Sequence, residues 1–179
     1  MNPGPVVKVL EALGVPFALV GGHAMAARGY PRFTTDLDLL TTERRMLDAL
    51  VWTDLIRQGA RVDARRGDAD DPLAGVVHIE LADASDIDVI VGRWPWEASL
   101  IGRAEPTPLM GLSLPVPRTS DLILLKLAAG GYLDRHDAAS LLKVGDRLTL
   151  VSEVERHIDE VRPDIRLAWR DLLASVPAE

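Results

Sequence analysis

The stretch that decides the fold is Ala18-Leu19-Val20-Gly21-Gly22-His23-Ala24, followed by Arg32-Phe33-Thr34-Thr35-Asp36-Leu37-Asp38-Leu39-Leu40. The apolar run 17–20 predicts a strand that stops at the two glycines, and the small residues that follow predict a short helix over 23–28. A second strand is expected over 37–41. Alternate side chains of a strand share a face, so Asp36 and Asp38 should project together, about 6.6 Å apart along the chain. Two like charges on one face repel unless a cation lies between them, and an all-oxygen site suits Mg²⁺.

The glycine pair allows a second interpretation of the same stretch. Two glycines at a turn before a helix let a phosphate approach outward-pointing backbone N–H groups. Taken alone, the pair is better explained as a simple turn, and the acidic pair as a solvated strand edge. Together, on either side of one short helix, they supply an anion cradle and a cation site, which are the two needs of a reaction on a nucleoside triphosphate.

Gly21-Gly22 followed by Arg32-x-Thr34-x-Asp36-Leu37-Asp38 resembles the signature of the polymerase-beta-like nucleotidyltransferases. The gap from His23 to Thr35 lies at the long end of the range in that signature. The Arg-x-Thr-x-Asp-x-Asp form is most similar to the AbiEii-type toxin nucleotidyltransferases, and lincosamide and aminoglycoside nucleotidyltransferases carry a similar stretch. The resemblance is specific over 17–40 and looser over 86–92 and 119–142.

The resemblance implies a third metal-binding acid on a neighbouring strand, and two-metal phosphoryl transfer generally needs one. In the segment Asp86-Ile87-Asp88-Val89-Ile90-Val91, the two acids share one face and the apolar residues share the other. We carry the role onto Asp88, and Asp86 is the alternative because it can simply close the preceding turn. The implied metal ligands and catalytic acids are therefore Asp36, Asp38 and Asp88, which would hold two Mg²⁺ ions, or Mn²⁺.

Lys126 is the first candidate for binding the nucleotide outside this stretch. It lies in the otherwise apolar segment 122–129, and periodicity alone favours a lysine whose amine reaches solvent. The segment from there through Asp134-Arg135-His136-Asp137 resembles a region of the toxin-like family in which the lysine faces the triphosphate. For Asp134 and Asp137 a helix-capping role is expected.

The remaining candidates for nucleotide binding are Gly21, Gly22, His23, Arg32 and Thr34. Arg32 can neutralise phosphate charge, and is equally well explained as a surface arginine after Pro31. His23 stands where a helix begins and can contact a phosphate, although a lone histidine is weak support for a site.

Composition limits the classes of protein. With 179 residues, 47% hydrophobic residues and no cysteine, the chain can bury a core and has neither disulfides nor a thiolate metal site. The net charge of −7 argues against broad, non-specific binding to nucleic acid. No signal peptide or membrane-spanning run is evident, so a cytoplasmic protein without a membrane partner is expected.

The order of elements predicts an α+β fold: a mixed nucleotidyltransferase-type sheet flanked by helices, followed by a C-terminal helical region. We expect a core over 1–118 and helices packed on it over 119–179. Strands are expected over 17–20, 37–41, 61–64, 76–81, 87–91 and 109–116, with a turn at 83–85 joining an antiparallel hairpin. Helices are expected over 5–13, 23–28, 43–58, 97–103, 134–144, 152–161 and 163–173, and in one more segment from 119 to the glycines at 130 and 131.

These residues predict a metal-dependent nucleotidyltransferase that moves NMP from an NTP such as ATP to a hydroxyl group. If the toxin-like resemblance holds, the acceptor is the 3′ end of a tRNA or a protein, and a cognate antitoxin is a partner in a toxin–antitoxin or abortive-infection pair. The alternatives are an antibiotic nucleotidyltransferase acting on aminoglycosides or lincosamides, and a non-catalytic module that binds a nucleotide or a partner protein.

Overall fold

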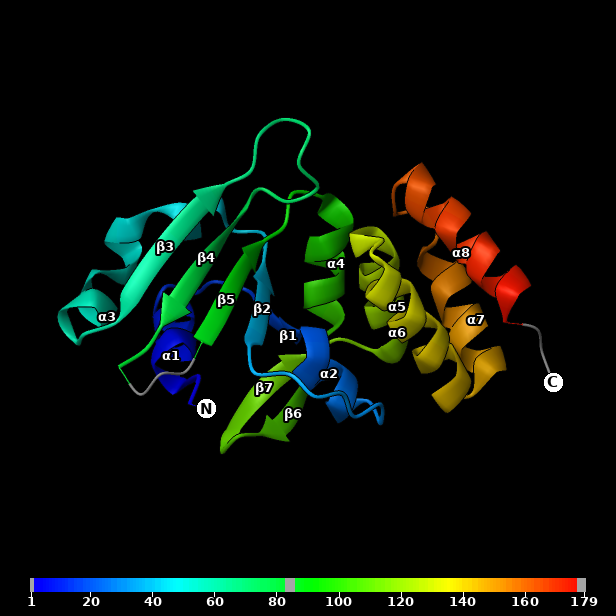
Figure 1. The fold of residues 1–179 in the computed structure, drawn as a ribbon, viewed down its shortest axis with the longest axis horizontal. Coiled ribbons are helices and arrows are strands. Elements are labelled where there is room, and N and C mark those ends of the chain that lie inside the picture. Colours follow the sequence, from blue (N-terminus) through cyan, green and yellow to red (C-terminus); the bar gives the residue numbers. More distant parts are fainter. Residues whose placement is uncertain (1, 83–85, 177–179) are drawn as a thin grey trace.

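The computed structural model describes residues 2–82 and 86–176, and its centre is a mixed five-stranded sheet (Figure 1). The strand order is β1-β2-β5-β4-β3. β2 and β5 run parallel, and the other neighbours are antiparallel. The strands are β1 (Ala18–Val20), β2 (Leu37–Thr41), β3 (Arg61–Arg66), β4 (Gly75–Glu80) and β5 (Asp86–Val91).

Helices occupy most of the second half of the chain, where α5 to α8 gather on one side of the sheet (Figure 1). A two-stranded ribbon, β6 (Glu105–Leu109) with β7 (Leu112–Val116), lies between the sheet region and these helices in sequence. The helices are α1 (Gly4–Ala12), α2 (Gly21–Ala27), α3 (Thr53–Arg57), α4 (Pro95–Arg103), α5 (Thr119–Ala129), α6 (Tyr132–Val144), α7 (Arg147–His157) and α8 (Pro163–Ser175). The predicted α+β class with a mixed sheet and a helical second half is confirmed.

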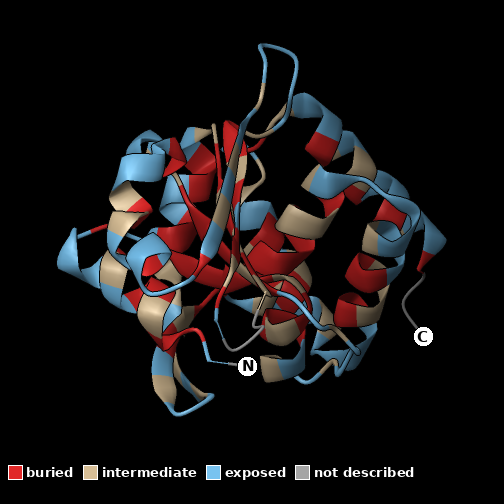
Figure 2. Ribbon diagram, turned by 60° about the vertical axis from the view of Figure 1, so that its left-hand side comes forward, coloured by how far each residue is buried: buried red, intermediate tan, exposed pale blue. Residues whose placement is uncertain are grey.

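The central strands β2 and β5 set the two faces of the sheet. Leu37 and Leu39 are fully buried, as are Ile87 and Val89 on the neighbouring strand, and Figure 2 shows this buried layer along the sheet. Burying each such side chain contributes about 1.5–3 kcal/mol, which fixes which face points inward. A slip of one residue would reverse every side chain, so the acidic residues are held on the opposite face.

The predicted helix over 43–58 is wrong. The chain instead forms two short 3₁₀ helices, η1 (Arg44–Leu47) and η2 (Ala49–Trp52), before α3. Asp48 adopts an extended conformation, and its carboxylate accepts a hydrogen bond from the backbone N–H of Leu50 at 3.0 Å. The fully buried Trp52 donates its indole N–H to the Met46 carbonyl at 2.9 Å. These bonds satisfy the polar groups that a continuous helix would have paired.

Several element boundaries also differ from the prediction. The helix α2 begins at Gly21 itself, and α7 begins at Arg147 because Asp146 caps it at the backbone N–H of Leu148, 3.3 Å away. Strand β6 was not predicted, because its prolines lack the N–H that a central strand needs. In a two-stranded ribbon, the N–H groups that these prolines lack would point away from the partner strand, so no hydrogen bond between the strands is lost. The predicted turn at 83–85 lies outside the described residues, although the antiparallel pairing of β4 with β5 is confirmed.

No helix in the described part of the chain is both long and apolar enough to cross a membrane.

Candidate active site

Asp38 and Asp88 are direct neighbours on the parallel strands β2 and β5. Adjacent strands lie about 4.8 Å apart, and paired residues project to the same face, so the two carboxylates are side by side. Asp36 lies in the bend just before β2, and its carboxylate accepts a hydrogen bond from the Thr35 hydroxyl at 2.8 Å. Asp86 belongs to the same face of β5, but it lies two residues before Asp88 and is paired with Glu80, so it is further from Asp38.

The electrostatics of Asp38 show that these acids act on one another. Burial, and then the charges of Asp88 and Asp36, raise the pKa of Asp38 to about 6. Lys126 and Arg32 act in the opposite direction on the same carboxyl group. Three carboxylates and two cations therefore share one end of the site.

Gly21 is held against Asp38. Its φ is +67°, and a Cβ atom built on it would lie 1.9 Å from the Asp38 Oδ2 atom. Any larger residue would displace the carboxylate and would also be strained. At Gly22 a Cβ atom would lie 2.8 Å from the Thr34 Cγ2 atom. The glycine pair is therefore needed for close packing against the acidic strand, a role that the sequence did not reveal.

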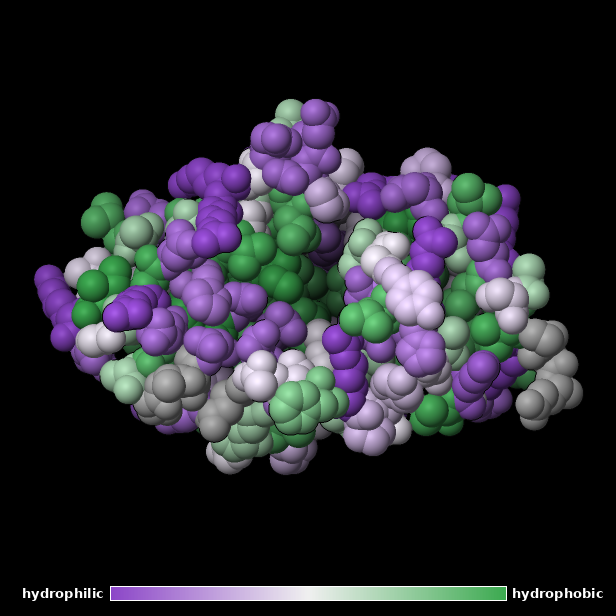
Figure 3. All heavy atoms as spheres, viewed as in Figure 1, coloured by the Kyte–Doolittle hydropathy of each residue, from purple (hydrophilic) through white to green (hydrophobic). Residues whose placement is uncertain are grey.

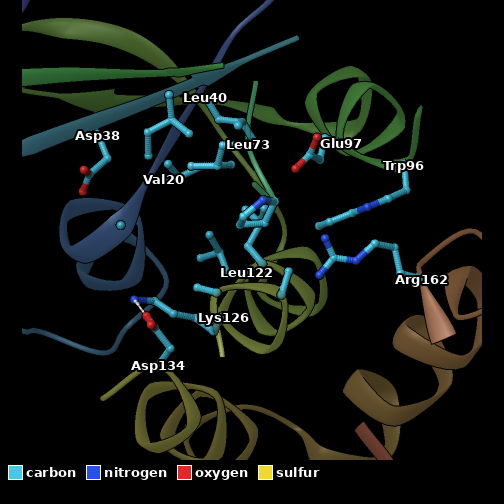
Figure 4. A pocket seen from close by; sticks show the side chains of 16 residues that line it. Val20, Asp38, Leu40, Leu73, Trp96, Glu97, Leu122, Lys126, Asp134 and Arg162 are labelled. Atoms are coloured by element: carbon cyan, nitrogen blue, oxygen red, sulfur yellow. Dashed lines mark hydrogen bonds and ion pairs between the residues drawn. The ribbon is translucent and has the colours of Figure 1, made fainter. Parts of the chain in front are cut away.

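A cleft of about 420 Å³ opens beside Asp38, between the sheet and the helices α4, α5 and α6 (Figure 4). Asp38, Lys126 and Asp134 line one end of it, and Trp96, Glu97 and Arg162 line the other. Gly21, which also lines the cleft, packs against Asp38. Figure 3 shows the surface hollowed between the two halves of the molecule, with hydrophobic residues in the hollow. The apolar walls include Val20, Leu40, Leu73, Ile90, Leu122 and Leu125.

A second, more open groove of about 630 Å³ reaches Asp88 from the side of β3 and β4. His78, which is directly opposite Asp88 in the sheet, lies in this groove, and its Nδ1 atom is 2.8 Å from the Asp88 Oδ1 atom. This hydrogen bond raises the pKa of His78. The sequence assigned His78 no role, and the predicted strand bounds of 76–81 and 87–91 do not place it opposite Asp88, because the register in the structure differs from theirs.

The loop between β3 and β4 separates the cleft from the groove. Pro72 and Leu73 line both hollows. The Arg93 guanidinium donates hydrogen bonds to the carbonyls of Asp68, Ala69 and Leu73, and the Trp94 indole donates to the Pro72 carbonyl. The loop is thereby fixed to the segment that leads into α4.

Lys126 and Arg32 meet two carboxylates of α6. The Lys126 Nζ atom is 2.9 Å from Asp134 Oδ1 and 2.9 Å from Asp137 Oδ2. The Arg32 Nη1 atom is 2.5 Å from the same Asp137 oxygen. The expectation that Asp134 and Asp137 cap the helix is wrong. The N-cap of α6 is Gly131, and among the described residues both acids pair with the cations instead.

Thr34 and His23 were predicted to bind the nucleotide, but neither is among the described residues that line the cleft. Thr34 packs on Gly22 and donates its hydroxyl to the Asp36 carbonyl at 3.2 Å. The buried Nε2 atom of His23 has no hydrogen-bond partner in the described part of the chain. Burial lowers the pKa of His23, which favours the neutral ring.

The sequence predicted no functional residue at the far end of the cleft, where Trp96, Glu97 and Arg162 lie. The buried Glu97 carboxylate accepts hydrogen bonds from the backbone N–H groups of Arg93 and Trp94, at 2.6 and 2.7 Å. Burial raises the pKa of Glu97. Arg162, at the start of α8, lies 5.4 Å from the centre of the Trp94 ring. These residues are far apart in sequence, so no local pattern could have connected them.

The donor set of the acidic strands suits a hard divalent cation. Within the described residues, no three His, Cys, Asp or Glu side chains converge as a ready metal-binding group, and one oxygen of Asp88 is engaged by His78. The mutual repulsion at Asp38 is nevertheless the electrostatic condition that a cation relieves. Asp36, Asp38 and Asp88 supply only oxygens, as Mg²⁺ prefers.

No protein-family model matches this sequence, and no curated protein matches it. Two solved structures of the antibiotic-resistance factor ANT(2'')-Ia are similar to it. The solution structure has a TM-score of 0.55 at 16% identity, over 96% of this chain and 90% of that chain. The crystal structure in complex with adenylyl-2''-tobramycin has a TM-score of 0.52 at 18% identity, over 93% of each chain. At such identity the likeness shows the fold, and the predicted nucleotidyltransferase-type sheet is confirmed.

Proposed function

We propose that this chain transfers NMP from an NTP to a hydroxyl group of an acceptor. The observation that carries the proposal is the position of Asp38 and Asp88. Asp38 lines the cleft and Asp88 lines the groove, and the two residues are direct neighbours in the sheet. A donor in one hollow and an acceptor in the other would meet at these carboxylates.

The cleft is the proposed nucleotide site, formed between the core over 1–118 and the helical region over 119–179. The phosphates would lie at the end with Gly21 and Lys126, which line the cleft beside Asp38. Arg32 is not among the described lining residues, but its charge acts on Asp38 and would add to the positive potential there. The base would lie between the apolar walls, toward Glu97 and Arg162. His23, behind the cleft lining, is left out of the contacts we propose.

Asp36, Asp38 and Asp88 are the residues that would hold the divalent cations. When bound, Mg²⁺ or Mn²⁺ supplies neutralisation of charge on the attacking and leaving oxygens. In the reaction, the acceptor oxygen bonds to the α-phosphorus, the bond from that phosphorus to the α–β bridging oxygen breaks, and pyrophosphate leaves. Asp88, which lines the groove, would receive the proton of the acceptor hydroxyl.

For the acceptor, the signature favours the toxin-like reading, in which a tRNA 3′ end or a protein hydroxyl is modified and a cognate antitoxin binds the enzyme. The net negative charge of the chain disfavours extended contacts with RNA, so an RNA acceptor would bind only through a short terminal segment.

The second candidate is nucleotidylation of an antibiotic. It is supported by the fold shared with ANT(2'')-Ia and by the acidic residues Asp63 and Asp71, which line the groove beside Arg65 and Arg66. A cationic drug would find carboxylates there.

The test is to incubate the protein and Mg²⁺ with each α-labelled NTP in the presence of total tRNA, total protein, or a panel of aminoglycosides and lincosamides. The proposal expects label in one of these acceptors and none with Asp38→Asn. Calorimetric binding of Mg²⁺–NTP with no transfer to any acceptor would favour the non-catalytic module instead.

A further inference from the structure

Asp137 is a buried charge that two cations share. Its side chain is 4% exposed, and one oxygen contacts both Arg32, at 2.5 Å, and Lys126, at 2.9 Å. A carboxylate is costly to bury without partners. Here the partners come from two other segments, the loop before β2 and the helix α5. Asp137 therefore ties both proposed phosphate-binding cations to one fixed point on α6.

Asp134 is one helical turn earlier on the same face of α6 and is placed differently. Its side chain is 27% exposed, and it contacts Lys126 but forms no ion pair with Arg32 in the described part of the chain. Asp134 lines the cleft, whereas Asp137 is not among the described residues that do (Figure 4). Asp137 therefore holds the cations from behind, and Asp134 holds Lys126 from the side on which a ligand enters.

The charges of the four side chains balance. Two carboxylates face two cations, and the Lys126 side chain is only 13% exposed. An incoming phosphate must compete for the Lys126 ammonium with one of its two carboxylates. Asp134 is the one that can turn to solvent at the smaller cost, because its side chain is 27% exposed, against 4% for Asp137, and it pairs with Lys126 alone among the described residues.

We propose that the two carboxylates of α6 have opposite effects on polyphosphate binding. Asp137 is a positioning residue that fixes Lys126 in the cleft lining and holds Arg32 on the same carboxylate oxygen, and Asp134 occupies the place of a phosphate and leaves when a polyphosphate arrives. The inference rests on the proposed function, since it takes this end of the cleft as the phosphate site.

The sign of the effect separates this proposal from simple charge repulsion. If each carboxylate only repelled an anion, removing either one would strengthen binding. If Asp137 positions the cations, its removal weakens binding even though a negative charge has been taken away. Opposite signs at two acids of one helix are not expected from a general electrostatic field.

The experiment is calorimetric titration of the full chain with inorganic tripolyphosphate in Mg²⁺, which needs neither a base nor an acceptor. Asp134→Asn should tighten binding about three- to tenfold, and Asp137→Asn should weaken it about tenfold or more. Asp137→Glu keeps the charge but moves the carboxylate, and it should also weaken binding. Asp171→Asn, an exposed acid on α8, is the matched control and should change nothing.

Circular dichroism establishes that each variant is folded, and Asp137→Glu carries the test if Asp137→Asn is not. The proposal is overturned if Asp134→Asn and Asp137→Asn shift the affinity in the same direction, or if Asp137→Glu binds like the wild type. Failure of the proposed function looks different. The wild type would then bind no tripolyphosphate, or Lys126→Gln would bind it unchanged.

Discussion

The two ends of the cleft are built in different ways. At the Asp38 end, carboxylates and cations from three segments, the loop before β2 and the helices α5 and α6, are paired across the fold, and Asp38 is repelled by its neighbours. At the Glu97 end, the buried carboxylate is satisfied locally by the backbone that starts its own helix. The first end stores unfavourable charge that a ligand can relieve, whereas the charge of Glu97 at the second end is already satisfied by hydrogen bonds. We infer that the first end carries the chemistry and the second mainly binds.

The largest effect should come from the acids of the central strands. Asp38→Asn and Asp88→Asn should each lower the rate of NMP transfer by on the order of 10³-fold, because the charge that stabilises the transition state is lost. The measurement is transfer of α-label under single-turnover conditions. Retention of more than a tenth of the rate by either variant would remove the basis for the contrast between the two ends.

Gly21→Ala should be the next most damaging change. The new Cβ atom would collide with the Asp38 carboxylate, and the positive φ would be strained, so transfer should fall about 100-fold through displacement of the acid. Gly102→Ala is the control, because a Cβ atom at that position meets nothing within 4 Å. If both variants transfer at the wild-type rate, Gly21 does not hold Asp38 in place.

At the far end, Arg162→Ala should raise the KM for the nucleotide about tenfold and leave kcat within about twofold, as expected for loss of uniform binding. Arg170→Ala, an exposed arginine on the same helix, serves as the control. A fall in kcat with an unchanged KM would show that this end takes part in chemistry and would contradict the division of roles.

The smallest effect is on stability and has the opposite sign. In metal-free protein, ionised Asp38 opposes folding, because its pKa is about 6 when folded and lower when unfolded. Asp38→Asn should therefore raise the free energy of unfolding by on the order of 1–2 kcal/mol above pH 6, or a few degrees in Tm. The difference should shrink as the pH falls toward 4, where Asp38 is protonated in the folded state. Thermal denaturation in EDTA across this range measures it, and a variant less stable than the wild type at pH 7 would contradict the expectation.

The sequence predicted the parts of the molecule in which short-range pattern and packing agree. Strand β2 has the predicted bounds, because the buried Leu37 and Leu39 lie on either side of Asp38 and allow only one register in the sheet. The segment 43–58 failed for the opposite reason. Its apolar spacing suits a helix, but the helix is broken by the hydrogen bond that the Asp48 carboxylate accepts and the one that the Trp52 indole donates, and periodicity carries no information on these bonds.

For the site, the sequence found the acids and cations but not their partners. The hydrogen bond of His78 to Asp88 follows from strand pairing, and the contacts of Asp137 with Arg32 and Lys126 join residues about a hundred positions apart or on different helices. Such contacts depend on how α5 and α6 pack together, and no local spacing encodes that. The assignment of Asp36, Asp38 and Asp88 to metal binding stays a prediction.

The loop pinned by Arg93 has a consequence for how two substrates would be handled. Pro72 and Leu73 form a thin dividing wall with one hollow on each side, and hydrogen bonds to Arg93 and Trp94 keep it from swinging freely. Molecules bound in the two hollows would therefore contact the same two residues from opposite sides. A shift of Pro72 and Leu73 on binding of the donor would change the affinity for the acceptor, and the reverse, before any bond is formed or broken.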